Sequence, residues 1–345
     1  MPNLLDRWQY RVSQGARVAF YGAHYRLGAE LQRKDKGPRP VTEGPVPPVK
    51  AVRAAMTALF EDDWRNIEAG IYAMPHDLVP RTGALLKKSR AFFADIPKVA
   101  ARRARGDGVE VRETERPERY PPYYLQNFHY QTDGYLSETS AALYDFQVEA
   151  LFAGAADAMR RQALVPLAAF LKGRDQRAMR LLDIACGTGR FLSFVKDNYP
   201  RLDVTGLDLS PAYLDEARRS LAQWRGVDIL RANAESLPFD DGSQDIVTSI
   251  FLFHELPPKV RVQVAGEIGR VLKPGGLCVI VDSLQIGDRP EFDGLLELFP
   301  ARFHEPFYLG YAREDLAALF GAAGLTLRES KLAYLSKVMT FEKAV

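Results

Sequence analysis

A mostly apolar run followed by two closely spaced glycines lies near the middle of the 345-residue chain. Residues 181–185 carry four apolar side chains interrupted by Asp183, which predicts a buried parallel strand. Gly187-Thr188-Gly189 then predicts a tight turn that opens a helix at about Arg190. Glycine lets the backbone approach a ligand closely, and the first turn of a helix presents free N–H groups. Such a turn suits a dinucleotide or another adenosine cofactor.

The spacing after the glycines bears on which of these two cofactor classes fits. A dinucleotide fingerprint requires a third small residue three places after the second glycine, and that position holds Leu192. A second predicted strand, residues 203–208, ends in Asp208, whose carboxylate can accept hydrogen bonds from both hydroxyls of a ribose. Ser210 and Pro211 then favour the start of a helix. The dinucleotide interpretation is weakened, whereas another adenosine cofactor still fits.

The two segments resemble the first two motifs of class I S-adenosylmethionine-dependent methyltransferases. The first is Asp183-x-x-x-Gly187-x-Gly189, and the second is the strand that ends at Asp208. Three further segments continue the resemblance. Residues 232–239 resemble the adenine-contacting loop, residues 245–253 the fourth strand, and residues 269–276 the turn before the fifth strand. Within the family the chain is similar to the type 11 methyltransferases, which include the quinone C-methyltransferases.

The resemblance implies S-adenosyl-L-methionine as the cofactor, and it implies which positions bind it. They are Asp183, Ala185, Gly187, Gly189, Asp208, Leu209, Asn233, Ala234, Glu235 and Ile250. One position departs from the family pattern, because the adenine loop usually begins with Asp and here begins with Asn233. An Asn carbonyl can still accept a hydrogen bond from the adenine amino group.

Methyl transfer from a sulfonium is an in-line displacement, so the enzyme must hold the nucleophile close to the methyl carbon. A hydroxyl, ammonium or enol nucleophile must also lose a proton. His254 follows the fourth predicted strand, and ligands of open α/β sheets lie beyond the carboxyl ends of the strands. We predict His254 as the catalytic base, with Glu255 orienting it. A histidine that caps the next helix or bonds to the backbone stays an open alternative.

Residues 120–136 hold six aromatic side chains and a histidine in a segment rich in turn residues. In class I methyltransferases the residues before the first strand commonly close over the cofactor, so the resemblance implies a lid here. Packing of the tyrosines between two parts of the chain is the alternative. His304 lies in a predicted insertion after the fifth strand. The predicted substrate-binding residues are Tyr124, His129, Tyr130, Tyr135, His254 and His304.

Strands and helices alternate after residue 180, which predicts an α/β fold with a doubly wound parallel sheet. Two final strand-like segments, residues 325–332 and 334–341, suit the family's antiparallel pair and the strand order 3-2-1-4-5-7-6. The predicted domains are a mainly helical extension over residues 1–119, an aromatic-rich helical lid over 120–176, and a methyltransferase core over 177–345. Residues 137–171 are predicted to continue as helix, with Ser137 as its cap.

The extension is predicted to contain two helices joined by a proline-rich linker over residues 34–48. The first helix has an apolar stripe, which is formed by Leu4, Leu5, Trp8, Val12, Ala16, Ala19 and Phe20. We predict that this stripe docks on the core, and weak contact with a membrane surface stays an alternative. The second helix covers residues 49–71, and a basic segment over residues 81–105 follows. Residues 106–122 form the boundary of the extension.

Composition excludes several classes of protein. No apolar run approaches the ~18 residues that span a bilayer. The first ten residues lack the apolar centre of a secretory signal, so we expect a cytoplasmic protein. Cys186 and Cys278 have no partner at metal-ligand spacing, and no second histidine follows His254 four places on, so no metal is predicted.

Three functions remain at this stage. The favoured one is methyl transfer to a small, aromatic or lipophilic acceptor. The second is a nucleic-acid or protein methyltransferase that docks its substrate through the extension, in which basic residues outnumber acidic ones by seven over residues 1–120. No Asn-Pro-Pro-aromatic segment follows the fourth strand, which argues against methylation of adenine in nucleic acid, and no nucleic-acid partner is expected. The third is a catalytically silent scaffold. The oligomeric state is left open.

Overall fold

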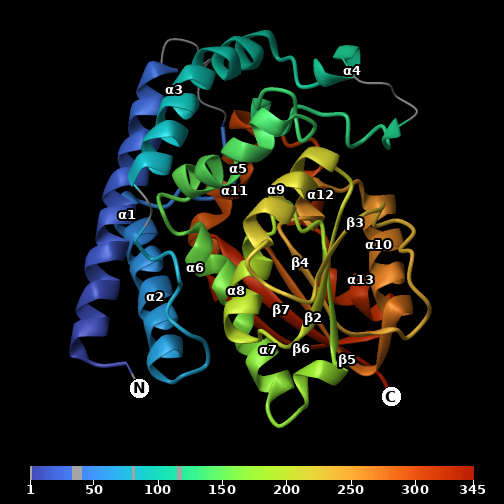
Figure 1. Ribbon diagram of the computed structural model, residues 1–345. Helices are drawn as coiled ribbons and strands as arrows, with labels where there is room; N and C mark the ends of the chain where they lie inside the picture. Colours follow the sequence, from blue (N-terminus) through green and yellow to red (C-terminus); the bar gives the residue numbers. More distant parts are fainter. Residues whose placement is uncertain (1, 33–40, 80–81, 115–118) are drawn as a thin grey trace.

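The computed structural model describes residues 2–32, 41–79, 82–114 and 119–345, and its centre is a seven-stranded sheet (Figure 1). The strands are β1 (Arg180–Ile184), β2 (Asp203–Asp208), β3 (Val227–Arg231), β4 (Gln244–Ile250), β5 (Leu272–Ser283), β6 (Leu325–Ala333) and β7 (Ser336–Lys343). Their order is β3-β2-β1-β4-β5-β7-β6, with β7 antiparallel to β5 and β6 and the other pairs parallel. The predicted fold class and strand order are confirmed.

The register of the parallel strands brings three functional segments to one edge of the sheet. Asp183 on β1 lies opposite Gly206 on β2 and Thr248 on β4. The glycine turn after β1, the acidic end of β2 and the residues after β4 therefore meet at the carboxyl ends of the strands, where ligands of such sheets bind.

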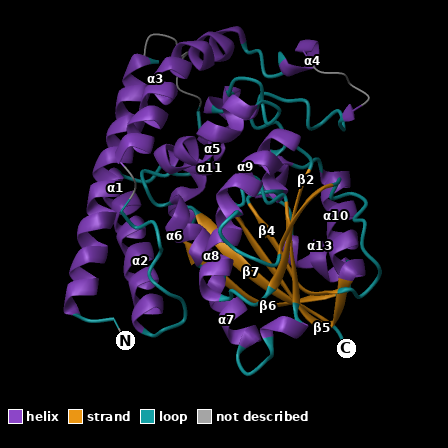
Figure 2. Ribbon diagram, in the orientation of Figure 1, coloured by secondary structure: helices purple, strands orange, loops and turns teal. Residues whose placement is uncertain are grey.

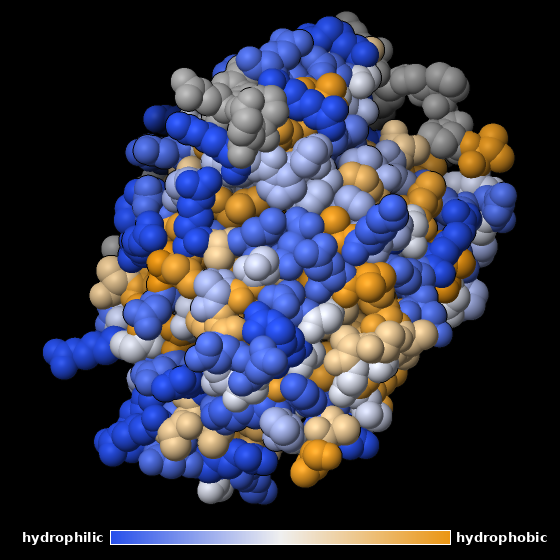
Figure 3. Space-filling view, turned by 90° about the vertical axis from the view of Figure 1, so that its right-hand side faces the viewer, coloured by the Kyte–Doolittle hydropathy of each residue, from blue (hydrophilic) through white to orange (hydrophobic). Residues whose placement is uncertain are grey.

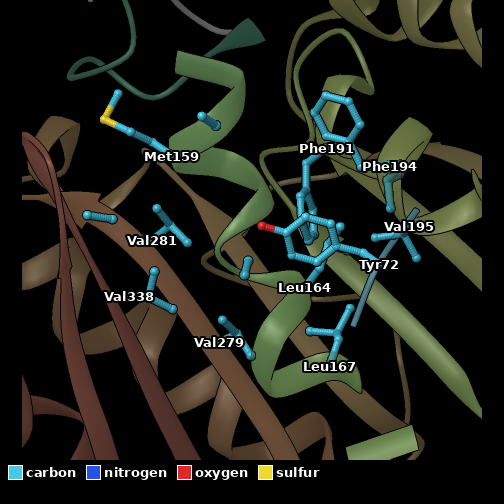
Figure 4. Packing of buried hydrophobic residues seen from close by; sticks show 14 of the residues in the cluster. Tyr72, Met159, Leu164, Leu167, Phe191, Phe194, Val195, Val279, Val281 and Val338 are labelled. Carbon is cyan, nitrogen blue, oxygen red and sulfur yellow. The ribbon is translucent and has the colours of Figure 1, made fainter. Parts of the chain in front are cut away.

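Helices cover both faces of the sheet, and the strands are apolar on both faces as this arrangement requires. One face carries α7 (Leu164–Leu171), α8 (Arg190–Asn198) and α9 (Pro211–Leu221). The other carries α10 (Pro258–Val271), α12 (Tyr308–Ala312) and α13 (Leu316–Ala322). Figure 4 shows Leu164 and Leu167 of α7 facing Val279 of β5 in the first of these cores.

The extension stands along one side of this core (Figure 1). Its helices are α1 (Leu4–Leu31), α2 (Val49–Glu68), α3 (Thr82–Arg105) and the short α4 (Val111–Thr114). α1 and α3 pack on α5 (Glu138–Leu151) and α2 packs on α6 (Ala156–Arg161), and both α5 and α6 precede the sheet in the chain. The remaining helices are α11 (Asp293–Arg302) and the short 3₁₀ helices η3 (Phe128–Tyr130), η4 (Gln176–Ala178), η5 (Phe253–Glu255) and η6 (Pro290–Phe292). Figure 2 shows this largely helical surround of the strands.

The predicted docking face of the first helix is wrong. α1 forms as expected, but it packs through a different stripe, which consists of Tyr10, Gln14, Arg17, Tyr21, His24 and Gly28. Leu4, Leu5, Trp8 and Val12 are exposed. The reason is that the partner surface is itself charged, since Arg17 pairs with Glu149 and Asp157 in the interior. A helix face that docks through buried charged residues cannot be predicted from the spacing of apolar residues.

Other boundaries differ in detail. Ser137 caps α5 as predicted, with its side chain accepting from the N–H of Ser140 at 3.1 Å, but residues 137–171 are three helices instead of one. Gly154, at φ 85°, lies in the first break. The described part of the linker, residues 41–48, passes α11, where the N–H of Gly294 donates to the Pro45 carbonyl. Residues 34–40 of the predicted linker, Arg81 of the basic segment and residues 115–118 of the boundary lie outside the described residues.

The surface carries polar and apolar residues in mixture. On the face shown in Figure 3, hydrophobic residues are scattered among hydrophilic ones. Within the described ranges, the helices are all too short or too polar to cross a membrane.

The two faces of α1 give a test of how the extension docks. Tyr10 is 2% exposed, its ring contacts Trp64, and its hydroxyl donates to Asp63 at 2.6 Å. We expect Tyr10→Ala to lower the free energy of unfolding by about 3 kcal/mol or more, as for other buried aromatic truncations. Trp8 is 66% exposed, so Trp8→Ala should change the free energy of unfolding by less than about 0.5 kcal/mol. Urea unfolding followed by circular dichroism measures both, and a larger effect of Trp8→Ala would contradict the observed docking.

Candidate functional site

A cavity opens at the carboxyl ends of β1, β2 and β4, beneath the segment that precedes α5. Its lining includes seven large aromatic side chains, two carboxylates and the glycine turn. The lining residues are Tyr123, Tyr124, Phe128, Tyr135, Tyr144, Ala185, Gly187, Leu207, Asp208, Leu209, Tyr213, Ala232, Asn233, Ala234, Ile250, Phe251, Leu252, Glu255 and Leu256.

The turn after β1 has the backbone that close ligand approach needs. Ala185, Gly187 and Gly189 have φ values of 58°, 54° and 75°, in the left-handed region that favours glycine. At Gly189 a Cβ atom would lie 2.6 Å from a methyl carbon of Leu221 on α9, so this position also needs glycine for packing. Gly189 therefore shapes the turn from behind, whereas Ala185 and Gly187 line the cavity. The positive φ of Ala185 is strain held at a candidate site.

Asp208 is fixed at the end of β2 by the backbone around it. Its two carboxylate oxygens accept N–H groups of Gly187 and Ser210, each at 2.9 Å. Burial raises the pKa of Asp208, and the hydrogen bonds from the backbone oppose that rise. Each oxygen keeps a further lone pair, so the carboxylate can still accept from a ribose diol. This geometry fits the role that the family resemblance implies.

The predicted adenine loop lies on the same side of the cavity. Leu209, Asn233, Ala234 and Ile250 line it. The Asn233 side chain accepts the N–H of Glu235 and donates to its carboxylate, at 3.0 Å in both cases. Glu235 itself does not line the cavity. Its carboxylate also accepts a hydrogen bond from the hydroxyl of Tyr123 at 2.8 Å. Glu235 thereby ties the lid segment to the adenine loop.

Asp183 lies below the cavity and does not line it. It is 1% exposed on β1 and accepts the hydroxyl of Thr248 on β4 at 2.6 Å. Burial raises the pKa of Asp183 to about 7, against the effect of the Thr248 hydrogen bond. From this position Asp183 can support the glycine turn by bonding β1 to β4.

A cluster of aromatic side chains forms part of the cavity lining. Phe128 and Tyr135 stack with ring centroids 5.4 Å apart, and Tyr135 meets Tyr213 edge-on at 5.6 Å. Tyr144 packs edge-on against Tyr213 at 5.4 Å, and Tyr124 lies 6.2 Å from Tyr135. We name these five residues the aromatic wall. A flat apolar ligand can stack there out of water.

His254 is not among the lining residues, whereas its neighbour Glu255 is. His254 Nδ1 forms a hydrogen bond with Asp282 Oδ1 at 2.6 Å. The N–H of Phe253 donates to the other oxygen of Asp282 at 2.7 Å. Asp282 thus clamps η5 at two points. His254 Nε2 lies 3.9 Å from Glu255 Oε1, and the Tyr135 hydroxyl donates to the same oxygen at 2.5 Å.

The other predicted histidines lie behind the aromatic wall. His129 Nε2 is 3.2 Å from Glu305 Oε1, and His304 Nε2 is 2.8 Å from Gln126 Oε1. The Tyr130 carbonyl accepts the Arg102 guanidinium at 2.6 Å. None of these three residues lines the cavity. They connect the lid segment to α3 and to the insertion before α12, so the structure brings only Tyr124 and Tyr135 of the predicted substrate residues to the cavity surface.

Several lining residues were not predicted. Phe128 lies inside the aromatic segment, so the sequence pattern could have indicated it. Tyr144 and Tyr213 lie within helices whose sequences show no feature that marks them as cavity residues. Phe251 follows β4 at φ 62°, a strained conformation for a bulky residue that sequence does not reveal.

Comparisons with known proteins bear on this site. A family model described as a methyltransferase domain matches residues 181–276. A ubiquinone/menaquinone biosynthesis C-methyltransferase of Desulfotalea psychrophila is 38% identical over 112 residues, which are 32% of this chain and 44% of that protein. A demethylmenaquinone methyltransferase of Thermus thermophilus is 38% identical over 31% of this chain and 49% of its own. The chain therefore spans about half the length of the curated relatives it matches.

Solved structures were also found. A geranyl diphosphate C-methyltransferase of Streptomyces coelicolor covers 52% of this chain and 79% of its own, at 17% identity and a TM-score of 0.42. An S-adenosylmethionine-dependent methyltransferase of Aquifex aeolicus covers 52% and 88%, at 19% identity and a TM-score of 0.40. The sequence matches confirm the resemblance to S-adenosylmethionine-dependent methyltransferases, and residues 181–276 match the model of a methyltransferase domain.

The geometry of Asp208 predicts how the cofactor is held. Asp208→Ala should weaken the binding of S-adenosylhomocysteine by about 100-fold or more, since hydrogen bonds to a charged group contribute about 1.5–3 kcal/mol each. Asp203→Ala is the matched control, because Asp203 lies exposed at the other end of β2. Isothermal titration calorimetry measures both. Unchanged affinity in Asp208→Ala would contradict the ribose role.

Proposed function

We propose that this chain uses its S-adenosylmethionine-dependent methyltransferase domain to methylate a small aromatic or lipophilic molecule of the hydroquinone or phenol type. The observation that carries the proposal is the aromatic wall, which lines the same cavity as Asp208 and the glycine turn. A flat acceptor stacked on the wall would lie beside the cofactor, and the proximity of the two reactants is the main requirement of a displacement.

The roles of the chain's residues follow from their positions. The cofactor supplies an electrophilic methyl group when it is bound. Asp208, the turn at Gly187 and the loop at Asn233 would hold its adenosine, and the aromatic wall would orient the acceptor and exclude water. The relatives support this acceptor class, because they are a ubiquinone/menaquinone biosynthesis C-methyltransferase and a demethylmenaquinone methyltransferase.

Methylation of nucleic acid or protein is the weaker alternative. It relied on the basic character of the extension, yet the structure uses part of that charge internally. Arg17 is 9% exposed and pairs with Glu149 and Asp157, and Arg102 is 3% exposed and pairs with Glu110. A silent scaffold is weaker still, because it has no physical need for a cavity lined by Asp208 and the glycine turn. The free, buried thiols of Cys186 and Cys278 fit the reducing, cytoplasmic setting that we propose.

Transfer of a labelled methyl group tests the acceptor class. We expect the purified chain to move label from S-adenosylmethionine to 2-prenyl-1,4-naphthohydroquinone or a simpler phenol, with the label recovered in an organic extract. Transfer RNA and a mixture of small basic proteins are offered in parallel. Label in either of these, or no label in any hydroquinone or phenol, would contradict the proposal.

A variant of the aromatic wall sharpens the same assay. Tyr144→Ala should raise the KM for the hydroquinone by about tenfold, because aromatic stacking contributes about 0.5–1.5 kcal/mol. Tyr25→Ala is the matched control, since Tyr25 is 41% exposed on α1.

A further inference from the structure

We propose that Glu255, and not His254, removes the proton from the acceptor, and that Tyr135 and the His254–Asp282 pair are positioning residues that orient and tune this carboxylate. The inference rests on the proposed methyl transfer and assigns its acid–base step. It also limits the acceptor to molecules that carry an ionisable hydroxyl.

The cavity leaves one carboxylate available for this task. Among the described residues that line it, the charged side chains are those of Asp208 and Glu255. Asp208 is bound by the N–H groups of Gly187 and Ser210 and lies beside the cofactor loops. Glu255 comes from η5, and its side chain is 15% exposed next to the aromatic wall. A general base must reach the proton that it removes, and Glu255 satisfies that condition whereas His254 does not line the cavity.

The hydrogen bonds around Glu255 fix its direction. One of its oxygens, Oε1, accepts the Tyr135 hydroxyl and faces His254 Nε2. Since both neighbours converge on Oε1, the second oxygen is the one left to face a ligand. Asp282 holds η5 from below by accepting the N–H of Phe253 and bonding to the ring of His254. The carboxylate is therefore held by partners from the lid segment and from β5.

The charges that surround Glu255 suit proton transfer near neutral pH. Burial raises the pKa of Glu255 to about 7, the charge of His254 and the hydrogen bond from Tyr135 lower it, and Asp282 and Asp208 raise it. Glu305, from the insertion before α12, also faces it, and burial together with the charge of Glu255 raises the pKa of Glu305 well above its ordinary value. The remaining neighbours, Tyr124 and Tyr144, are uncharged because burial raises the pKa of both hydroxyls.

His254 is in the wrong protonation state to be the base. Burial would lower its pKa, but attraction to Asp282 and the hydrogen bond with it raise the pKa of His254 to about 9. At neutral pH the ring is an imidazolium and has no lone pair to accept a proton. It can instead stabilise the ionised form of Glu255, whose oxygen lies 3.9 Å away.

The proposed step is balanced in atoms and charge. The Glu255 carboxylate takes the hydroxyl proton of the acceptor, the O–H bond breaks, and its electron pair stays on the acceptor oxygen. The resulting phenolate forms a bond to the methyl carbon through its oxygen, or through an activated ring carbon that then loses its own C–H proton while the oxygen regains one. The C–S bond of the cofactor breaks with its electron pair going to sulfur. One proton leaves overall, and Glu255 returns to its carboxylate by releasing that proton to water.

The pH dependence of turnover tests this role. Glu255 acts in its ionised form, so kcat with the hydroquinone should rise with pH and level off above a midpoint near 7. Glu255→Gln should lower kcat by roughly 10²- to 10⁴-fold, remove this rise and leave the affinity for S-adenosylhomocysteine unchanged. Glu149→Gln is the matched control, because burial also raises the pKa of Glu149 to about 7 outside the cavity. A rise that persists in Glu255→Gln, or disappears in Glu149→Gln, would overturn the proposal.

The positioning role of Tyr135 has its own measurement. Its hydrogen bond lowers the pKa of Glu255, so Tyr135→Phe should shift the midpoint of the kcat profile to higher pH. A packing role alone would change KM and leave the midpoint in place.

A titration without acceptor separates this inference from the proposed function. The pKa values of Glu149 and Asp183 are also raised to about 7, so infrared spectra of the complex with S-adenosylhomocysteine are compared between variants. The protonated-carboxyl band that disappears near pH 7 should lose one component in Glu255→Gln, and that same component should persist in Glu149→Gln. If no acceptor is methylated but the Glu255 component is present, the acceptor class is wrong and the perturbed carboxylate stands. If the spectra of Glu255→Gln and the wild-type chain are identical, Glu255 is not the base even where turnover is found.

Discussion

One buried carboxylate joins the extension, the lid and the cofactor loop. Asp157 on α6 is 5% exposed and contacts three arginines, which are Arg17 of α1, Arg160 of its own helix and Arg190 of α8. Burial alone would raise the pKa of Asp157, but Arg190 and the other two arginines hold it well below its ordinary range. Removing one member of such a cluster leaves uncompensated charge in the interior. The three parts of the chain are therefore coupled more tightly than their separation in sequence suggests.

This coupling reaches the candidate site through short links. Arg190 directly follows the glycine turn, so Asp157 anchors α8 close to the point where the turn opens it. Thr188 within the turn donates to Asp145 on α5, and Ser210 beside Asp208 donates to the Tyr135 carbonyl. The segment that supplies the aromatic wall is thus bonded to both cofactor loops. α1 and α3 pack on α5, the helix that carries Tyr144 of the aromatic wall, so the extension contacts an element that supplies this wall.

The backbone of the site could be predicted from the sequence more fully than its side chains. Apolar strands and the Gly187-Thr188-Gly189 turn are local patterns, and parallel strands bring their ends together by geometry. The docking face of α1 was predicted wrongly, because Arg17 and Tyr10 are polar residues that are buried against charges from elsewhere in the chain. The choice between His254 and Glu255 depends on Asp282, which clamps the short helix from a strand that follows later. No local pattern encodes such a contact.

The cavity holds two carboxylates whose surroundings suit different tasks. The donors to Asp208 are backbone N–H groups of the loops themselves, so they stabilise its charge and cannot exchange a proton with it. The groups that converge on Glu255 are a phenol and an imidazolium, and its pKa of about 7 leaves both protonation states populated in neutral solution. A carboxylate that is bound by backbone N–H groups suits the recognition of a ribose, whereas one with a pKa of about 7 suits proton transfer. The difference in donors, more than the identity of the residues, is what separates proposed binding from proposed chemistry within one cavity.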